Sequence, residues 1–207
     1  LKDVSFTVEK GTTLGILGGT GSGKTTLMML LDKLYDLPDG CGKITVGGVD
    51  IRNIKTEYLR KNIGMVLQEP YLFSRTLAEN IGITRKDISM DEIREAASAA
   101  CLDDTIMNFT QGYETFVGER GVTLSGGQKQ RAAIARMLTQ KTPIMVFDDS
   151  LSAVDTQTDV KIRKALEEMF GSSSVILISH RITTLMKADK IIVLDKGRIV
   201  EQGTHDE

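Results

Sequence analysis

One stretch near the start of the sequence combines glycines, a lysine and a threonine in a spacing that could hold phosphate. Its letters, GGTGSGKT, fit the pattern G-x-x-x-x-G-K-[ST]. Glycines let a loop wrap closely around phosphate groups, and backbone N–H groups then converge on the anion at a helix start. The lysine would reach the β- and γ-phosphates, and Thr25 would ligate Mg²⁺. The candidate nucleotide-binding residues are Gly18, Gly19, Thr20, Gly21, Ser22, Gly23, Lys24, Thr25 and Thr26.

The flanking residues supply the elements that this loop needs. The apolar run LGIL precedes it, and the helical run TTLMMLLDKL follows it. A glycine-rich turn that binds no ligand is the alternative. The order strand, loop, helix favours nucleotide binding.

A nucleotide site of this kind also needs a carboxylate near Mg²⁺ at the end of a neighbouring buried strand. The run PIMVFD places Asp148 at the C-terminal end of an apolar segment. Sheets of α/β proteins bind ligands at that end of their strands. A strand that simply ends in a solvated Asp is the alternative. The presence of the phosphate loop favours Asp148 as a metal ligand.

A second helix start could also bind an anion. The letters LSGGQKQR open the helical run RAAIARMLTQ. Ser125 is a suitable N-cap, and Gly126 and Gly127 leave the first backbone N–H groups uncovered by side chains. An ordinary capped helix is the alternative reading of these residues.

The pattern of apolar residues predicts an α/β fold. Strands are expected at residues 4–8, 13–17, 43–46, 63–67, 144–147, 175–179, 190–194 and 198–200. Helices are expected at residues 23–34, 91–100, 125–140, 156–170 and about 181–187. The stretch 76–138 shows helical patterns and no convincing strand, so an α/β core of residues 1–75 and 139–207 would be interrupted by an α-helical subdomain. The last two strands would form a hairpin that turns at Lys196-Gly197.

Composition excludes several classes of protein. Lys plus Arg is 26 and Asp plus Glu is 28, a net charge of -2, so the basic balance of a nucleic-acid-binding domain is absent. Cys41 and Cys101 form no C-x-x-C pair and are expected to be reduced thiols. No apolar run approaches the roughly 20 residues that cross a bilayer. The opening LKDVSFTV alternates like a strand and is unlike a signal peptide. The chain lacks an initiator Met and ends on the polar letters GTHDE, so it is expected to be a domain of something longer.

Taken together, the motifs resemble those of the ATP-binding-cassette (ABC) ATPases. LSGGQKQR is similar to the signature sequence of that family. VLQEP, with Gln68, is similar to its Gln-loop, and SAVD, with Asp155, to its D-loop. SHR contains His180, which is similar to its switch histidine. With the phosphate loop these elements stand in the family order and cover essentially the whole chain, and LFSRTLAENI, VGERG and IVEQGTH are closest to exporters.

The resemblance implies a P-loop NTPase core with a mixed, mostly parallel sheet between helices, an inserted α-helical subdomain and a small N-terminal antiparallel β part. All 207 residues would form one ABC ATPase domain. In this family two such domains pair head to tail around two ATP molecules. The signature of one chain, here Ser125, Gly126, Gly127 and Gln128, then grips the nucleotide held by the loop of the other.

The resemblance also implies a role for each remaining motif residue. Thr25, Gln68 and Asp148 would surround Mg²⁺, and Gln68 would relay the state of the metal toward the membrane side. His180 would hydrogen-bond the γ-phosphate, although an isolated His beside a strand is more often a packed or solvated residue. Asp155 would contact the dimer interface, and an N-cap for the helix that follows is compatible with that role.

The sequence departs from the family at Asp149, where the residue that polarises the attacking water is usually Glu. An aspartate carboxylate retreats by roughly 1–1.5 Å on bond lengths, and misplacement on that scale can cost about a hundredfold in rate. We therefore expect slow hydrolysis at this chain's own site and a heterodimeric exporter whose partner carries Glu. A homodimer that tolerates Asp is the alternative. The aromatic residue that stacks on adenine in the family would lie upstream of Leu1.

Three other functions compete with that of an exporter. Soluble ABC ATPases of chromosomes carry a long coiled coil between loop and signature, which is absent here, and those of translation usually hold two cassettes. A non-hydrolytic regulator is supported only by Asp149, and importers lack the VGERG wording. The expected partners are a second ABC domain and transmembrane domains, at the cytoplasmic side of the cell membrane, without nucleic acid. The transported substrate cannot be read from these residues.

Overall fold

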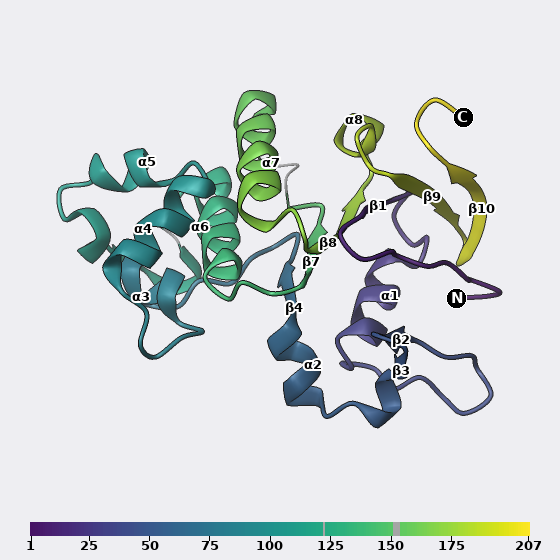
Figure 1. Ribbon diagram of the computed structural model, residues 1–207. Helices are drawn as coiled ribbons and strands as arrows, with labels where there is room; N and C mark the ends of the chain where they lie inside the picture. The colour runs from purple at the N-terminus through teal and green to yellow at the C-terminus, as the bar shows by residue number, and fades with distance from the viewer. Residues whose placement is uncertain (122, 151–153) are drawn as a thin grey trace. The chain divides into compact units, whose positions relative to one another are not determined.

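The computed structural model describes residues 1–121, 123–150 and 154–207, shown in Figure 1. The described chain forms two compact units. The first comprises Leu1–Gly64, Pro143–Asp148 and Ser173–Glu207, and the second comprises Met65–Thr142 and Asp149–Ser172. Each unit has its own buried core.

Six strands form one sheet, in the order β10-β9-β1-β8-β7-β4, and all of it except the second half of β4 belongs to the first unit. Its strands are β1 (Thr13–Gly18), β4 (Ile63–Val66), β7 (Ile144–Asp148), β8 (Ser174–Ser179), β9 (Lys190–Asp195) and β10 (Arg198–Gly203). Strand β1 pairs in parallel with both β8 and β9, and β7 pairs in parallel with β8. Strand β10 returns antiparallel to β9, with a register shift between Ile199 and Glu201. The chain therefore has the mixed, mostly parallel sheet that the sequence predicts.

The central strands are apolar on both faces because both faces are covered. On β1, Leu14 and Ile16 are buried, and so are Ile176 on β8, Phe147 on β7 and Ile192 on β9. These continuous runs of β-branched and aromatic residues carry the sequence signal that identified the strands.

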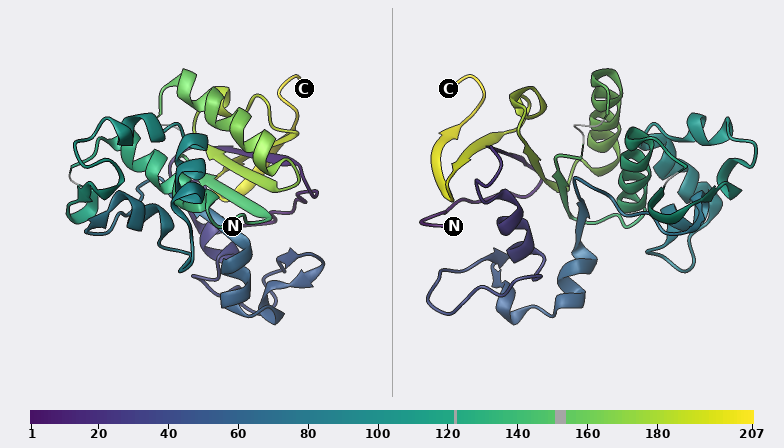
Figure 2. Two further views of the ribbon diagram at one scale, coloured as in Figure 1. Left: turned by 60° about the vertical axis from the view of Figure 1, so that its left-hand side comes forward. Right: turned by 180° about the vertical axis from the view of Figure 1, so that it is seen from behind.

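Short elements complete the first unit. They are α1 (Lys24–Leu31), β2 (Thr45–Val46), β3 (Val49–Asp50), a 3-10 turn (Ile51–Asn53), α2 (Thr56–Asn62) and α8 (Ile182–Leu185). Strands β2 and β3 pair antiparallel as a small hairpin, which Figure 2 shows beside α2. This hairpin is the small antiparallel part that the resemblance implies.

The strand predicted over residues 4–8 is wrong, because this segment joins no ladder. The side chains of Val4, Phe6 and Val8 are half-buried while those between them are exposed. The alternation correctly indicates which side chains face inward. A strand also needs a hydrogen-bonding neighbour, which local sequence cannot specify.

The second unit is mainly helical. It contains α3 (Leu77–Gly82), α4 (Met90–Ala99), α5 (Asp103–Met107), α6 (Gly126–Leu138) and α7 (Thr156–Phe170), together with 3-10 turns at Gly112–Glu114 and Glu119–Gly121. The prediction of no strand in 76–138 is wrong in one detail, because β5 (Arg75–Thr76) pairs antiparallel with β6 (Phe116–Val117). Two-residue ladders are too short to leave a periodic signal in the sequence.

Capping boxes define the starts of three helices in this unit. The pairs are Thr76 with Glu79 at α3, Ser89 with Glu92 at α4, and Ser125 with Gln128 at α6. In each box the N-cap hydroxyl accepts the backbone N–H three residues on, and the later side chain accepts the N-cap N–H. Helices α3 and α4 both pack on α6, which carries the small residues Ala132 and Ala135 in the core.

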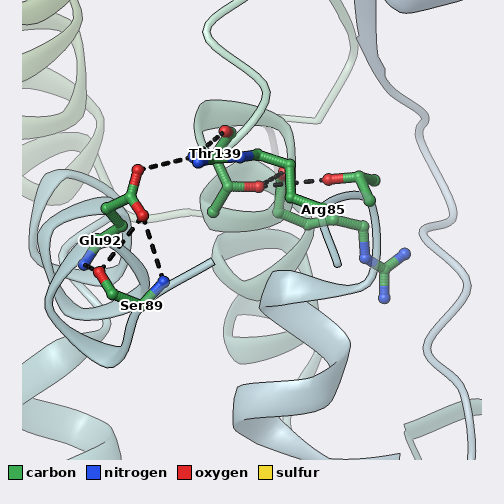
Figure 3. Close-up of polar contacts among 6 residues, drawn as sticks. Arg85, Ser89, Glu92 and Thr139 are labelled. Atoms are coloured by element: carbon green, nitrogen blue, oxygen red, sulfur yellow. Dashed lines mark hydrogen bonds and ion pairs between the residues drawn. The ribbon is translucent and has the colours of Figure 1, made fainter. Parts of the chain in front are cut away.

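Figure 3 shows how the end of α6 is joined to the start of α4. One guanidinium nitrogen of Arg85, Nη1, lies 2.7 Å from Glu92 Oε1 and 3.3 Å from the carbonyl oxygen of Thr139. The other carboxylate oxygen of Glu92 accepts the Ser89 N–H at 3.2 Å. Because Arg85 donates to a free carbonyl at the end of α6, it complements the negative end of that helix.

Candidate functional site

The predicted phosphate loop connects β1 to α1 and needs its glycines. Gly21 and Gly23 have φ of 77° and 108°, in the region that favours glycine. Gly18 is required by space, because a Cβ there would lie 2.6 Å from Ser22 Oγ and 2.7 Å from the Leu194 carbonyl oxygen. The loop backbone is thus held close to the neighbouring strand β9.

Lys24 is the first residue of α1, and its ammonium group lies across the loop. Nζ donates to the carbonyl oxygens of Gly18 at 2.6 Å and Gly19 at 2.8 Å, and lies 3.4 Å from Ser22 Oγ. A lysine ammonium has three donors, so these contacts orient it at the mouth of the loop. The positive charge therefore sits where the phosphates of a nucleotide would bind.

The start of α1 is suited to an anion. Its N-cap, Gly23, provides no side-chain cap, and its first turn contains no acidic residue. The first N–H groups of a helix have no partner within the helix, and the helix dipole adds positive potential there. Uncapped N–H groups beside an ammonium fit a phosphate group.

The turn between β9 and β10 supports the loop from one side, a role that the sequence did not reveal. Lys196 and Gly197 both have positive φ, as a type I′ turn requires, which confirms the predicted hairpin turn. The Gly197 N–H donates to the Ser22 carbonyl at 2.9 Å, and the Gly197 carbonyl accepts the Lys2 N–H at 2.7 Å. A glycine in a turn does not indicate which distant segment its backbone will contact, so the sequence could not predict these hydrogen bonds.

Strand register brings three of the predicted motifs to one edge of the sheet. Ile178 of β8 is paired with Ile16 of β1 on one side and with Asp148 of β7 on the other. Leu17, next to the loop, is paired with Ser179, so His180 follows immediately between the two motif strands. The phosphate loop, His180 and Asp148 therefore meet at the carboxyl ends of parallel strands, the usual ligand-binding edge.

The oxygen ligands for a metal at this edge would be few. The candidates of the first unit are Thr25, exposed on the first turn of α1, and Asp148, half-buried at the end of β7. Within the described ranges, no cluster of three or more His, Cys, Asp or Glu side chains could hold a metal ion. Mg²⁺ usually keeps several waters and takes one or two carboxylates plus substrate phosphates. This donor set suits Mg²⁺ bound together with a nucleotide.

Asp149 begins the part of the second unit that follows β7, and its backbone is unusual. Its φ is 47°, in the left-handed region. Asp is enriched there compared with most non-glycine residues, because its short side chain tolerates this conformation. The half-buried carboxylate is held at a sharp turn directly after the strand that ends at Asp148.

Gln68 also belongs to the second unit, in the irregular segment after β4. Its side chain is exposed, and its carbonyl oxygen accepts a hydrogen bond from the side-chain amide of Gln130 on α6. Gln68 is thus tied to the helix that starts with the signature residues.

The start of α6 differs from that of α1, because its own side chains cap it. Ser125 Oγ accepts the Gln128 N–H at 3.3 Å, and Gln128 Oε1 accepts the Ser125 N–H at 2.8 Å. Gly126 is open, since a Cβ there would meet nothing within 4 Å. The Ser125 hydroxyl accepts in the cap, and its hydrogen is still able to donate.

Asp155 caps α7, as the sequence allowed. Its Oδ1 accepts the Thr158 N–H at 3.0 Å, and the hydrogen bonds to Thr158 hold the pKa of this carboxyl below its usual value. The rest of the predicted D-loop includes Ser152 and Ala153, which lie outside the described residues.

Sequence reasoning missed three polar residues of the second unit, namely the buried Asn80 and Gln130 and the half-buried Arg136. Gln130 lies on the same face of α6 as the buried Ile134 and Met137, at spacings of four and seven residues. A polar residue within an apolar helical stripe was the available signal. Asn80 and Arg136 gave no comparable signal, because most of their partners are backbone groups, namely those of Tyr71, Phe73 and Asn80.

Comparison with known proteins agrees with this arrangement. A sequence model of the ABC transporter family matches residues 1–152. YgaD of Bacillus subtilis (strain 168), whose name assigns it provisionally to multidrug export ATP-binding/permease proteins, is 44% identical over all 207 residues. The ATP-dependent lipid A-core flippase of Legionella pneumophila (strain Paris) is 45% identical over the same span. The chain covers 35% of the length of each of these two relatives.

A solved structure described as a bacterial Atm1-family ABC exporter with ATP bound superposes on this chain with a TM-score of 0.94. The two are 41% identical, and the match covers 98% of this chain and 35% of that one. Identity at this level over nearly the whole chain shows common family as well as common fold. The chain therefore belongs to the ABC transporter family, as an ATPase domain of the exporter type.

Proposed function

We propose that this chain binds Mg-ATP at the loop Gly18–Thr25 and hydrolyses it in a head-to-tail pair with a second ABC domain, so powering export across a membrane. The observation that carries the proposal is the sheet edge of the first unit. An uncapped helix start, the Lys24 ammonium, His180 and Asp148 converge there through strand register.

The first-unit residues have separate tasks in this proposal. Lys24 and the N–H groups of the loop bind the phosphates, which the potential of α1 attracts. Thr25 and Asp148 hold Mg²⁺, and Gln68 of the second unit completes its ligands. The ion supplies charge neutralisation on the β- and γ-phosphates. His180 donates to the γ-phosphate from the end of β8.

The start of α6 serves the nucleotide of the partner. The Ser125 hydroxyl keeps its hydrogen for an oxygen presented from outside, and the uncovered Gly126 leaves space for that oxygen to approach. Gln128 supports the site indirectly, because its side chain orients Ser125 through the capping box. Asp155 lies next to the same interface in this proposal, at the start of α7.

Hydrolysis at this chain's own site is slow in our proposal, because Asp149 replaces the usual Glu. The shorter carboxylate reaches the attacking water poorly, while every proposed phosphate and metal ligand is retained. The signature residues are complete, so the chain would still support a competent site on a partner that carries Glu. A heterodimer is therefore favoured over a homodimer.

Export across a membrane also requires a permease. No helix among the described ranges is both long and apolar enough to span a bilayer. The relatives' names combine an ATP-binding part with a permease, or describe lipid flipping. We propose that residues 1–207 act as one ATPase domain on the cytoplasmic side of such a permease, with residues 76–138 as the subdomain that carries the signature.

The substitution Asp149→Glu tests the slow site. We expect phosphate release to rise by up to about a hundredfold, with Mg-ATP affinity unchanged, because no phosphate ligand is altered. Release is measured in the full protein with Mg-ATP in excess, and Lys24→Ala combined with Asp149→Glu controls for contaminating ATPases. Equal rates in the wild type and the Glu variant would show that the site is not slow.

A second candidate function is that of a cassette that binds ATP without hydrolysing it, and Asp149 is the residue that favours it. The same measurement distinguishes this regulator from a slow ATPase. Such a regulator would bind Mg-ATP normally, and would release no phosphate even with Asp149→Glu. Slow release by the wild type, lost in Lys24→Ala, supports a slow ATPase instead.

A further inference from the structure

The segment that follows Gln68 has almost no regular structure of its own. Residues 67–74 lie between β4 and the two-residue strand β5. Irregular backbone of this kind is normally mobile unless side chains from a rigid element hold it. In the second unit that element is helix α6, whose side chains reach the segment at two levels.

Gln130 forms the first of these contacts. Its side chain is only 3% exposed, and its Nε2 donates to the carbonyl oxygen of Gln68. The carbonyl can only accept, so the amide group must present its nitrogen here. Its Oε1 is buried and has no hydrogen-bond partner among the described residues.

A buried amide oxygen without a partner is unfavourable for folding. An apolar side chain of the same shape would avoid that cost, and the exposed Gln68 backbone could bind water instead. The fold nevertheless places Gln130 within an apolar stripe of α6, beside Ile134. Residues that break a local rule without a gain in stability are expected at functional positions.

Arg136, six residues further along α6, forms the second contact. Its Nη1 donates to the Tyr71 carbonyl at 2.8 Å, and its Nε donates to the Asn80 carbonyl at 2.8 Å. The fully buried Asn80 in turn pairs with both the N–H and the carbonyl of Phe73, at 2.8 and 2.9 Å. The guanidinium carbon of Arg136 lies 5.7 Å from the centre of the Phe73 ring.

We propose that Gln130 is a positioning residue for Gln68, fixing the backbone of Gln68 to the signature helix so that the two move as one body. Arg136 holds the remainder of the segment independently, so loss of Gln130 frees the part around Gln68 and leaves the part around Phe73 in place. This inference rests on the proposed function, in which Gln68 completes the ligands of Mg²⁺.

The test uses Gln130→Met in the full protein, because methionine keeps the shape and removes both the donor and the orphaned oxygen. Gln140→Met makes the same change just beyond the end of α6 and serves as the matched control. Gln130→Glu is the second variant, since it is isosteric and turns an acceptor toward the Gln68 carbonyl. Thermal midpoints verify that each variant is folded.

Two readouts distinguish positioning from a structural role. Without nucleotide, hydrogen exchange at residues 67–69 is expected to accelerate roughly five- to tenfold in Gln130→Met, the loss of one hydrogen bond, while exchange at residues 71–76 stays at the wild-type rate. With ATP, the Mg²⁺ concentration for half-maximal turnover is expected to rise by a similar factor. A lower thermal midpoint with neither change would overturn the inference.

Failure of this inference differs from failure of the proposed function. If the wild type binds and hydrolyses Mg-ATP through Lys24 and the Gln130 variants keep both the exchange rates and the Mg²⁺ dependence, only the role of Gln130 is wrong. If the wild type binds no Mg-ATP, the proposed function fails first, and the exchange measurement still reports whether Gln130 holds the Gln68 backbone.

Discussion

The starts of helices α1 and α6 both contain glycine, but they are built in opposite ways. At α1 no side chain caps the helix, and the Lys24 ammonium lies on the carbonyl oxygens of Gly18 and Gly19 in the preceding loop. At α6 a reciprocal pair of side chains, Ser125 and Gln128, already occupies two of the groups. An open helix start with a cation can hold an anion by itself. A closed one keeps its shape without ligand and offers a prearranged hydroxyl. In our proposal, the start of α1 therefore holds the chain's own nucleotide, and the start of α6 contacts the nucleotide of a partner.

Removing the cation from the open start should have the largest effect. We expect Lys24→Ala to weaken Mg-ATP binding by about 10- to 150-fold, because one charge-assisted hydrogen bond of roughly 1.5–3 kcal/mol is lost. Lys33→Ala is the matched control, a lysine just beyond the end of α1 whose Nζ donates to the Ile54 carbonyl. Calorimetric titration measures both. Equal affinities in the two variants would contradict the comparison.

The loop that leads from β1 to α1 and the start of α6 should also differ in how they tolerate an added methyl group. Gly18→Ala is expected to lower the free energy of unfolding by about 1–3 kcal/mol through overpacking, because its Cβ would press on Ser22 and on the Leu194 carbonyl. Gly126→Ala should leave it unchanged or raise it by at most about 1 kcal/mol, because nothing lies within 4 Å. Denaturant unfolding compares them. A destabilised Gly126→Ala would show that the start of α6 is more crowded than described.

A third helix start, at α4, should show a small pH effect that α1 lacks. The hydrogen bond from Arg85, joined by those from Ser89, lowers the pKa of Glu92 from 4.5 to about 2. The unfolded chain therefore takes up a proton first, and the stabilisation from Glu92 is full above about pH 4.5 and is lost as the pH falls toward 2. Comparing thermal midpoints of the wild type and Glu92→Gln over this range measures it. Parallel pH curves would rule out this contribution.

The sequence predicted the phosphate loop before α1 better than it predicted the segments that contact this loop. The motif between β1 and α1 and the apolar runs of β7, β8 and β9 were identified because buried parallel strands leave continuous hydrophobic letters. The edge where Gly18, Asp148 and His180 meet then follows from the rule that ligands bind at strand ends. The Gly197 contact with Ser22 could not be predicted, because it is a backbone hydrogen bond between distant segments.

In the second unit, the sequence indicated an N-cap residue but did not indicate the hydrogen bonds that the capped helix forms. Ser125 was correctly interpreted as an N-cap, whereas the reciprocal bond from Gln128 was not foreseen although S-x-x-Q is the capping-box pattern. The links from Arg136 to Tyr71 and from Gln130 to Gln68 join side chains to loop carbonyls. Every residue has such a carbonyl, so the sequence contains no pattern that marks the partner.

The most direct test of the account is Mg-ATP binding and turnover in Gly126→Ala beside Lys24→Ala. At concentrations where the protein is unpaired, we predict that Gly126→Ala binds Mg-ATP with wild-type affinity, whereas Lys24→Ala does not. In the paired protein, Gly126→Ala should lower the turnover of the partner's nucleotide by at least about tenfold, since one missing phosphate contact of roughly 1.5 kcal/mol has that effect. If Gly126→Ala instead weakened binding in the unpaired chain as strongly as Lys24→Ala, both helix starts would serve one nucleotide, and the account would be wrong.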